Sequence, residues 1–232
     1  MRYGDFCALD ALNLEVAQGE IVAFLGPNGA GKSTTLKLLA GLQQPTSGTV
    51  RVAGKNPRDA RFDIGVMPEN LGLFEDLSVE EHLELTADIY GAPKDRIGQL
   101  LRVLSLERGR RTFAAHCSHG MRKKTSFAMA LLHNPRVVLL DEPFEAVDPV
   151  SARVMFEILQ RAAREQGITV FLTSHILSIV ERLADRIAMV RGGHLVHIAE
   201  AGMPAGDLER LYFELVESPV SEKLQWLGSP KS

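Results

Sequence analysis

The stretch that most constrains this chain is residues 26–34, which read GPNGAGKST. An apolar run of strand type precedes them and a helical pattern follows. Because glycine adopts conformations closed to other residues, Gly26, Gly29 and Gly31 let the chain curl until successive N–H groups point inward at an anion. The positive end of a helix that starts at Lys32 adds to that field. The motif G-x-x-x-x-G-K-[ST] between a strand and a helix therefore predicts a loop that holds the phosphates of a nucleotide.

The remaining residues of this loop complete the predicted nucleotide site. We expect Lys32 to reach the outer phosphates and the Ser33 hydroxyl to bind Mg²⁺, which prefers hard oxygen ligands. A chance match in a chain of this length has odds of roughly one per cent from background composition, and the context lowers them further. The predicted set is Gly26, Pro27, Asn28, Gly29, Ala30, Gly31, Lys32, Ser33 and Thr34.

A second strand ends in two carboxylates. Residues 136–143 read RVVLLDEP, an apolar run closed by Asp141 and Glu142. Alone, such a run is most often a charged strand end, but its pairing with the phosphate loop reverses that interpretation. Asp141 is then placed to hold Mg²⁺ through water, and Glu142 to orient or deprotonate the attacking water in phosphoryl transfer.

The next strand ends in VFLTSHIL, and its tip carries Thr173, Ser174 and His175. Ligands of open parallel sheets gather at such strand ends. A lone histidine is more often structural, but contact with a γ-phosphate would explain a polar cluster at this tip. We therefore add His175 to Glu142 and Lys32 as predicted catalytic residues.

Strands and helices alternate along most of the chain, which predicts an α/β fold with a parallel sheet core. Between residues 71 and 133 the pattern is helical and amphipathic, as expected of an inserted helical subdomain. The predicted strands are 12–17, 20–25, 49–53, 62–66, 137–140, 168–173, 186–191 and 194–199, and the predicted helices are 32–42, 79–90, 94–106, one after Cys117, 149–165, 176–184 and 205–217. We expect one domain over residues 1–232, with an α/β core from 1–70 and 134–217 and a loose tail over 218–232.

Composition narrows the functional classes. The net charge of −3 and the pI near 6.2 give no broad basic field of the kind that nucleic-acid binding needs. The basic clusters at 108–111 and 122–124 are therefore interpreted as solvated helical faces. Apolar runs such as 21–25 are too short to span a bilayer, and Met1 leads into a polar turn, so we expect no signal peptide. Two cysteines form no disulfide framework, which favours a reducing cytosol.

The segment CSHGM, residues 117–121, opens a helix. Ser118 has the position and type of an N-cap, but a cap does not explain Gly120, because glycine in a first turn costs about 0.5–1 kcal/mol relative to alanine. With the phosphate loop and the Asp-Glu pair, this segment resembles the ATP-binding subunit of ABC transporters over nearly the whole chain. That resemblance implies a P-loop NTPase fold, with a RecA-like parallel core, a small antiparallel β-subdomain and the helical insert.

The resemblance also implies ATP and Mg²⁺ as ligands and a head-to-tail dimer. In this family an LSGGQ-type signature closes over the nucleotide of the other subunit, and Ser118, His119, Gly120 and Met121 occupy its place. His119 replaces the first glycine, whereas Ser118 and Gly120 keep phosphate contact in trans feasible. Gly120 would then permit close approach of the backbone to the partner's γ-phosphate.

Further residues match family positions one at a time. Tyr3 resembles the aromatic side chain that stacks on adenine, although only two residues precede it where the family has a strand. Asp148 resembles the aspartate that couples the two subunits, and His175 the switch histidine. Glu69 stands where a glutamine commonly senses Mg²⁺ and the membrane partner, so it is a further predicted metal ligand. Phe144 stands where a small Thr or Ser is common, a departure that the sequence does not explain.

The function that the resemblance implies is a transport motor. ATP binding would close a dimer and hydrolysis would open it, and a separate integral-membrane permease would hold the subunit at the cytoplasmic face of the membrane. The compact length and the YGxxxAL-type start resemble exporters with separately encoded membrane subunits. One alternative is a catalytically weak nucleotide switch in a heterodimer, against which stand Glu142 and His175. A soluble ABC ATPase acting on nucleic acid is the other, but such proteins usually carry two cassettes or a coiled-coil insertion.

Overall fold

The structure is a computed structural model that describes residues 1–200, 202 and 206–215. Its strands are β1 (Arg2–Tyr3), β2 (Phe6–Cys7), β3 (Ile21–Leu25), β4 (Ile64–Met67), β5 (Val137–Leu140), β6 (Thr169–Ser174), β7 (Arg186–Arg191) and β8 (His194–Glu200). Its helices are α1 (Lys32–Leu39), α2 (Val79–Tyr90), α3 (Asp95–Val103), α4 (His119–Leu132), α5 (Pro149–Gln166), α6 (Leu177–Leu183) and α7 (Asp207–Leu215), with 3₁₀ turns at Arg61–Asp63, Glu107–Gly109 and Ala114–His116.

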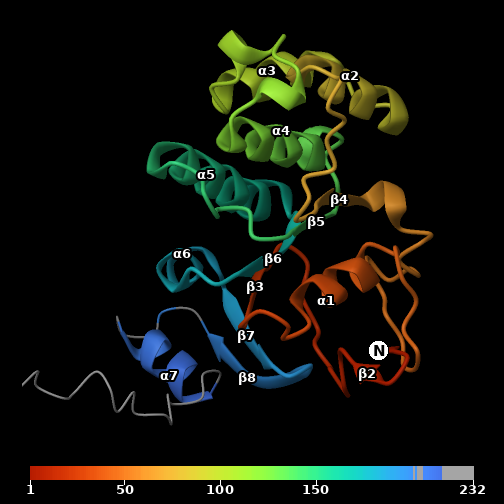
Figure 1. Ribbon diagram of the computed structural model, residues 1–232, viewed down its shortest axis with the longest axis vertical. Helices are drawn as coiled ribbons and strands as arrows, with labels where there is room; N and C mark the ends of the chain where they lie inside the picture. Colours follow the sequence, from red (N-terminus) through yellow and green to blue (C-terminus); the bar gives the residue numbers. More distant parts are fainter. Residues whose placement is uncertain (201, 203–205, 216–232) are drawn as a thin grey trace, which may run out of the picture.

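A six-stranded sheet in the order β4-β5-β6-β3-β7-β8 forms the centre of the molecule (Figure 1). Its strands run parallel except β8, which pairs antiparallel with β7. Strand β6 lies between β3 and β5 and pairs with both, so that Leu25 lies beside Ser174 and Leu140 beside Leu172. The carboxyl ends of β3, β5 and β6 therefore meet at one edge of the sheet.

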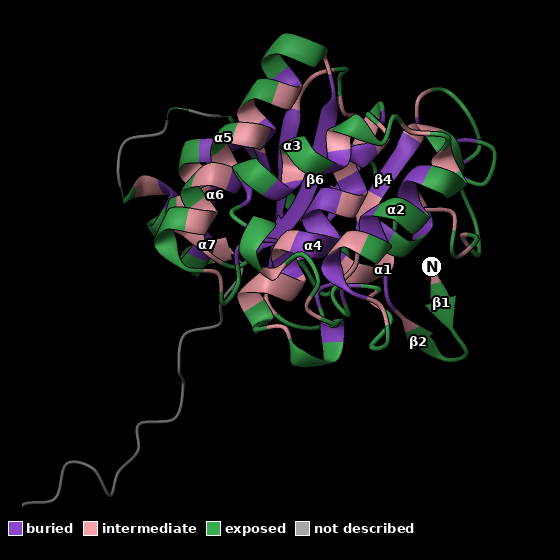
Figure 2. Cartoon of the chain, turned by 90° about the horizontal axis from the view of Figure 1, so that it is seen from above, coloured by how far each residue is buried: buried purple, intermediate pink, exposed green. Residues whose placement is uncertain are grey.

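Both faces of the sheet are covered, which explains why its central strands are continuous apolar runs. Along β3, Ile21, Ala23 and Leu25 join one core cluster while Val22 and Phe24 join another on the opposite face. In Figure 1, α1 lies on one side of the sheet and α5 and α6 lie on the other. Figure 2 shows the buried central strands between exposed outer helices.

Helices α2, α3 and α4 form a helical layer beside the β4 end of the sheet, and α4 packs directly on β4 (Figure 1). A capping box starts α2, since the Ser78 side chain accepts from the Glu81 N–H and the Glu81 carboxylate accepts from the Ser78 N–H. Gly65 of β4 permits the close approach of α4, because a Cβ there would lie 1.8 Å from the carbonyl oxygen of Ala130. Across the described residues, every helix falls short of the length and apolar character needed to cross a membrane.

The predicted parallel strands and the helices that follow them are confirmed to within a few residues, but the predicted strands 12–17 and 49–53 are wrong. Leu12, Leu14 and Val16 alternate in burial as strand residues would, yet no backbone ladder pairs them in the described structure. The second segment contributes only an isolated antiparallel bridge between Val52 and Lys55. Antiparallel pairing near the N-terminus is thus confined, in the described residues, to this bridge and to the β1-β2 hairpin.

Two further boundaries differ from the prediction. The helix expected over 94–106 ends at Val103, and the last helix spans Asp207–Leu215. Residues 205, 216 and 217 of that predicted helix, and the tail 218–232, lie outside the described residues.

Candidate functional site

The phosphate loop leaves β3 and returns as α1, and its glycines are required by close neighbours. A Cβ on Gly26 would lie 2.5 Å from the carbonyl oxygen of Val190, and one on Gly31 would lie 2.5 Å from Cδ2 of Leu9. Gly29 and Gly31 have φ values of 79° and 103°, in the left-handed region that favours glycine. The loop is therefore packed from behind by β7 and by the N-terminal segment, which fixes its backbone.

Lys32 is buried at the start of α1, with 8% of its surface exposed. Its Nζ donates to the carbonyl oxygens of Gly26 at 2.7 Å and Pro27 at 3.4 Å and lies 3.7 Å from Oε1 of Glu142. The other loop residues include Ala30, whose carbonyl accepts from the Gly193 N–H, and the half-buried Ser33 and Thr34 in the first turn of α1, while Asn28 and Gly29 are exposed. The loop thus presents a fixed ammonium group together with exposed backbone, which is the donor set that a polyphosphate needs.

Asp141 follows β5 and is held by the neighbouring strand β6. The hydroxyl of Thr173 donates to Oδ1 of Asp141 at 2.6 Å and accepts from the N–H of Glu142 at 3.0 Å. Thr173 is fully buried, and the Ser174 hydroxyl accepts a hydrogen bond from the N–H of Ile176. Of the polar cluster that the sequence predicted at this tip, only His175 keeps an exposed side chain. The carboxylate of Asp141 suits a hard cation such as Mg²⁺.

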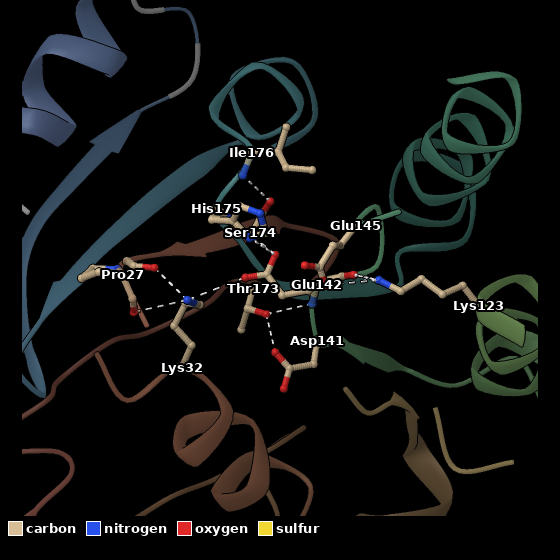
Figure 3. Close-up of polar contacts among 11 residues, drawn as sticks. Pro27, Lys32, Lys123, Asp141, Glu142, Glu145, Thr173, Ser174, His175 and Ile176 are labelled. Atoms are coloured by element: carbon tan, nitrogen blue, oxygen red, sulfur yellow. Dashed lines mark hydrogen bonds and ion pairs between the residues drawn. The ribbon is translucent and has the colours of Figure 1, made fainter. Parts of the chain in front are cut away.

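Glu142 is the centre of the site. Its Oε2 accepts from the backbone N–H of His175 at 3.2 Å and lies 3.0 Å from ring atom Nδ1 of His175 (Figure 3). Its φ of 46° is left-handed, a conformation that costs a non-glycine residue roughly 1–2 kcal/mol. Such strain persists only where the surroundings over-determine it and is common at functional sites. The structure thus brings together Lys32, Asp141, Glu142 and His175 as the sequence predicted.

Sequence reasoning missed a fifth residue at this site, Lys123. The 122–124 cluster was interpreted as a solvated helical face, which is wrong for Lys123, since only 3% of its surface is exposed. Its Nζ donates to the carbonyl oxygen of Glu142 at 2.6 Å, from the side opposite Lys32 in Figure 3. The signal was present in the sequence, because Phe127 and Ala130 follow at i+4 and i+7 and put Lys123 on the apolar face of α4.

The segment before α4 lies apart from these contacts. Ser118 is the N-cap, as predicted, and its hydroxyl accepts from the Met121 N–H at 3.2 Å. Ser118 and His119 are exposed, and a Cβ on Gly120 would have no atom within 4 Å. In the described part of the chain, residues 118–121 make no hydrogen bond or ion pair with the Glu142 group. No contact among the described residues therefore explains the glycine.

Comparison with known proteins decides the family. The sequence model of a family described as "ABC transporter" matches residues 9–145, a range that includes the phosphate loop, residues 118–121, Asp141 and Glu142. The chain belongs to the ABC transporter family. The predicted family and its P-loop NTPase fold are thereby confirmed.

Individual relatives agree with this assignment. The chain is 37% identical over 199 residues to the bacitracin transport ATP-binding protein BcrA of Bacillus licheniformis, covering 84% of this chain but only 65% of BcrA. A solved structure described as an ATP-binding subunit of an ABC transporter matches with a TM-score of 0.80 and 33% identity, over 90% of this chain and 89% of that one. The cassette MJ0796, solved as a dimer in a post-hydrolysis state with ADP and Pi, matches with a TM-score of 0.81 and 27% identity, over 87% of this chain and 95% of that one.

The remaining residues carried over from the ABC family lie outside the Glu142 group. Tyr3 in β1 is 41% exposed, and its hydroxyl bonds to the side-chain oxygen of Gln43. Glu69 is exposed two residues after β4, at the same sheet edge as Asp141. Asp148 caps α5, accepting from two backbone N–H groups, and its pKa is lowered chiefly by the hydrogen bond from Ser151.

The departure at Phe144 has a structural explanation. A small Thr or Ser is common at this position in the ABC family, but Phe144 is buried here and belongs to the larger core cluster. The large side chain therefore serves packing.

Proposed function

We propose that this chain binds ATP with Mg²⁺ at the phosphate loop and hydrolyses it, as one of two ATP-binding subunits that drive a separate membrane permease. The observation that carries the proposal is the group of Lys32, Asp141, Glu142 and His175 at the carboxyl ends of three adjacent strands. This group supplies, within one buried frame, a cation for phosphate, a carboxylate for a hard metal and a carboxylate for water.

Each side chain has a part in the proposed reaction. Lys32 binds the outer phosphates by exchanging its loop carbonyl partners for phosphate oxygens. Ser33, Asp141 and Glu69 offer the oxygen ligands for Mg²⁺, which when bound neutralises the charge of the phosphates. Glu142 orients the attacking water or accepts its proton, and His175, bonded to the same carboxylate, contacts the γ-phosphate.

The second half of the site would come from another subunit. Ser118 is exposed and Gly120 is half-buried at the N-terminus of an α-helix, where N–H groups and the helix dipole favour an anion. The dimeric state of the related MJ0796 supports an arrangement of two subunits. We propose that they pack head to tail and that Asp148 couples them. The other subunit is a second copy of this chain or a different ABC subunit.

The proposal also assigns residues to the contact with adenine and to the contact with the membrane permease. Tyr3 would stack on adenine, and Glu69 with the following segment 71–133, the predicted helical subdomain, would face the permease at the cytoplasmic side of the membrane. An exporter-like role rests on the resemblance of the N-terminus and the SHGM variant, and no role in nucleic-acid binding is proposed, given the net charge of −3.

The test uses two variants and two measurements. Lys32→Ala should abolish binding of a fluorescent ATP analogue, because the ammonium group that holds the outer phosphates is gone. Glu142→Gln should bind ATP normally, lose steady-state turnover and accumulate as an ATP-bound dimer in size-exclusion chromatography with light scattering. Unchanged nucleotide affinity in Lys32→Ala, or full turnover by strictly monomeric protein, would overturn the proposal.

His119 favours a second candidate, a catalytically weak switch in a heterodimer. The imidazole is exposed where the family signature has its first glycine, so it adds bulk to the surface that would meet the partner's phosphates. Under this candidate the purified chain binds ATP but turns it over only after another ABC subunit is added. Steady-state turnover by the purified chain alone would exclude it.

A further inference from the structure

Helix α4 carries a buried ammonium group that reaches the site of the proposed chemistry. Lys123 donates to the carbonyl oxygen of Glu142 at 2.6 Å, and its Nζ lies 3.9 Å from Oε2 of Glu145. Both partners follow β5, whereas Lys123 lies in the second turn of α4, the helix that Ser118 caps. The contact therefore joins the helical layer to the catalytic strand end.

A lysine in this place needs negative charge around it. Burial lowers the pKa of Lys123, and the nearby carboxylates of Glu145, Glu142, Asp141 and Glu69 oppose that effect. Lysine is almost never buried unless it is paired. Lys123 is paired with the carboxylates that follow β5. A lysine on a solvated helical face would need no such partners.

The carbonyl that Lys123 contacts belongs to a strained peptide. Glu142 has a left-handed φ of 46°, and hydrogen bonds hold it on both sides of its Cα. Its N–H donates to Thr173 of β6, and its carbonyl accepts from Lys123 of α4. The Glu142 carbonyl also accepts from the Glu145 N–H at 3.3 Å, a longer bond within the same loop. Removing the 2.6 Å bond from α4 therefore leaves the carbonyl with this local bond alone, so the backbone can relax toward an unstrained φ and move the carboxylate away from His175.

We infer that Lys123 is a positioning residue that holds Glu142 in its reactive conformation and ties it to the helix whose N-terminus would contact the partner's nucleotide. The inference rests on the proposed role of Glu142. The N-terminus of α4 would contact the nucleotide bound by the partner subunit. Its second turn would position Glu142, the carboxylate that activates water at this chain's own nucleotide. Closure at one site would then reach the carboxylate of the other through a single helix.

The central test is Lys123→Met, which keeps an apolar stem and removes the donor. We expect the kcat for ATP hydrolysis to fall about tenfold or more, since misplacement by about 1 Å can cost about a hundredfold. The Kd for a fluorescent ATP analogue should stay within about twofold, because Lys123 makes no contact with the phosphate loop. Lys94→Met is the matched control, since it removes an exposed lysine ion-paired with Asp88 and should leave both constants unchanged.

A double-mutant cycle separates positioning from a general loss of stability. In a Glu142→Gln background, where the reactive carboxylate is absent, Lys123→Met should reduce the residual turnover of radiolabelled ATP by less than about twofold. If the losses multiply instead, Lys123 acts elsewhere and the inference is wrong. If the methionine variant does not fold, Lys123→Gln replaces it, because its shorter amide side chain falls short of the Glu142 carbonyl.

The outcomes also distinguish this inference from the proposed function. Loss of turnover in Glu142→Gln with wild-type kcat in Lys123→Met would overturn only the role of Lys123. Wild-type turnover in Glu142→Gln would overturn the proposed function on which that role rests. A fall in kcat with unchanged Kd in Lys123→Met, together with no further loss in the double variant, would support both.

Discussion

Gly120→Ala should change stability and activity in opposite directions. Gly120 lies in the first turn of α4 with a helical φ, and no atom lies within 4 Å of the place that a Cβ would take. A methyl group there meets no clash and removes the conformational freedom that glycine keeps in the unfolded chain. We expect the free energy of unfolding to rise by about 0.5–1 kcal/mol, which for a chain of this size raises Tm by roughly 1–4 °C.

The same methyl group should weaken the proposed contact in trans. If the backbone at Gly120 approaches the partner's γ-phosphate, a Cβ holds that phosphate away from the helix N-terminus. Loss of a comparable oxyanion contact costs about 10²–10³ in kcat, so we expect at least a tenfold fall in ATPase activity. Binding of a fluorescent ATP analogue to the monomer should not change, whereas the ATP-bound dimer formed in a Glu142→Gln background should weaken in light scattering.

Gly98→Ala is a matched control. Gly98 is a glycine within α3, is exposed and also has no atom within 4 Å of an added Cβ. It should gain similar stability, measured by urea and thermal unfolding, with unchanged ATPase activity. If Gly120→Ala is stabilised and hydrolyses ATP as fast as Gly98→Ala, the explanation of the glycine by a contact in trans is refuted.

Three further predictions follow from the site and its surroundings. Thr173→Val leaves the Asp141 carboxylate and the following N–H without their buried partner, so urea unfolding should show a loss of about 2–4 kcal/mol, whereas Thr86→Val, which removes only a bond back to its own helix, should lose under about 1 kcal/mol. Glu69→Gln should show a shallower dependence of ATPase on Mg²⁺ than the wild type, since it removes a negative charge beside the triphosphate; superimposable curves would contradict this. Burial lowers the pKa of His133 from its ordinary value of 6.5, so below that value the unfolded chain takes up a proton that the folded chain lacks. Stability should therefore fall as the pH drops from about 7 toward 5, by at most about 1.4 kcal/mol per pH unit from this group, and His133→Phe should show a shallower fall.

The sequence predicted the phosphate-loop half of the site because local constraints determine it. Gly26, Gly29, Gly31 and Lys32 stand at fixed spacing between a buried strand and a helix, and the structure requires each glycine or charge at its own position. The buried strands were equally readable, because both faces are covered and the runs are apolar throughout. Here local pattern and tertiary packing specify the same structure.

The sequence predictions were wrong where contacts with distant parts of the chain determine the structure. Alternation at Leu12, Leu14 and Val16 reported which side chains are buried, but a strand also needs a neighbouring backbone to pair with, and the pattern carries no information about that. Lys123 was assigned to solvent with its basic neighbours, because residue type outweighed its helical position. Only the fold shows that a carbonyl and several carboxylates surround it.

The strand order has a consequence for how this chain can diverge. The groups of the phosphate-loop half directly follow three neighbouring strands, on the loops and on helix α1 at their carboxyl ends, and α2 and α3 reach that sheet mainly through α4. Substitutions on the outer surfaces of α2 and α3 can thus accumulate and change the surface of the helical layer while the Glu142 group stays intact. Changes on the inner surface of α4, by contrast, alter the helical layer and the Glu142 group together, so we expect that surface to change most slowly in sequence within the helical layer.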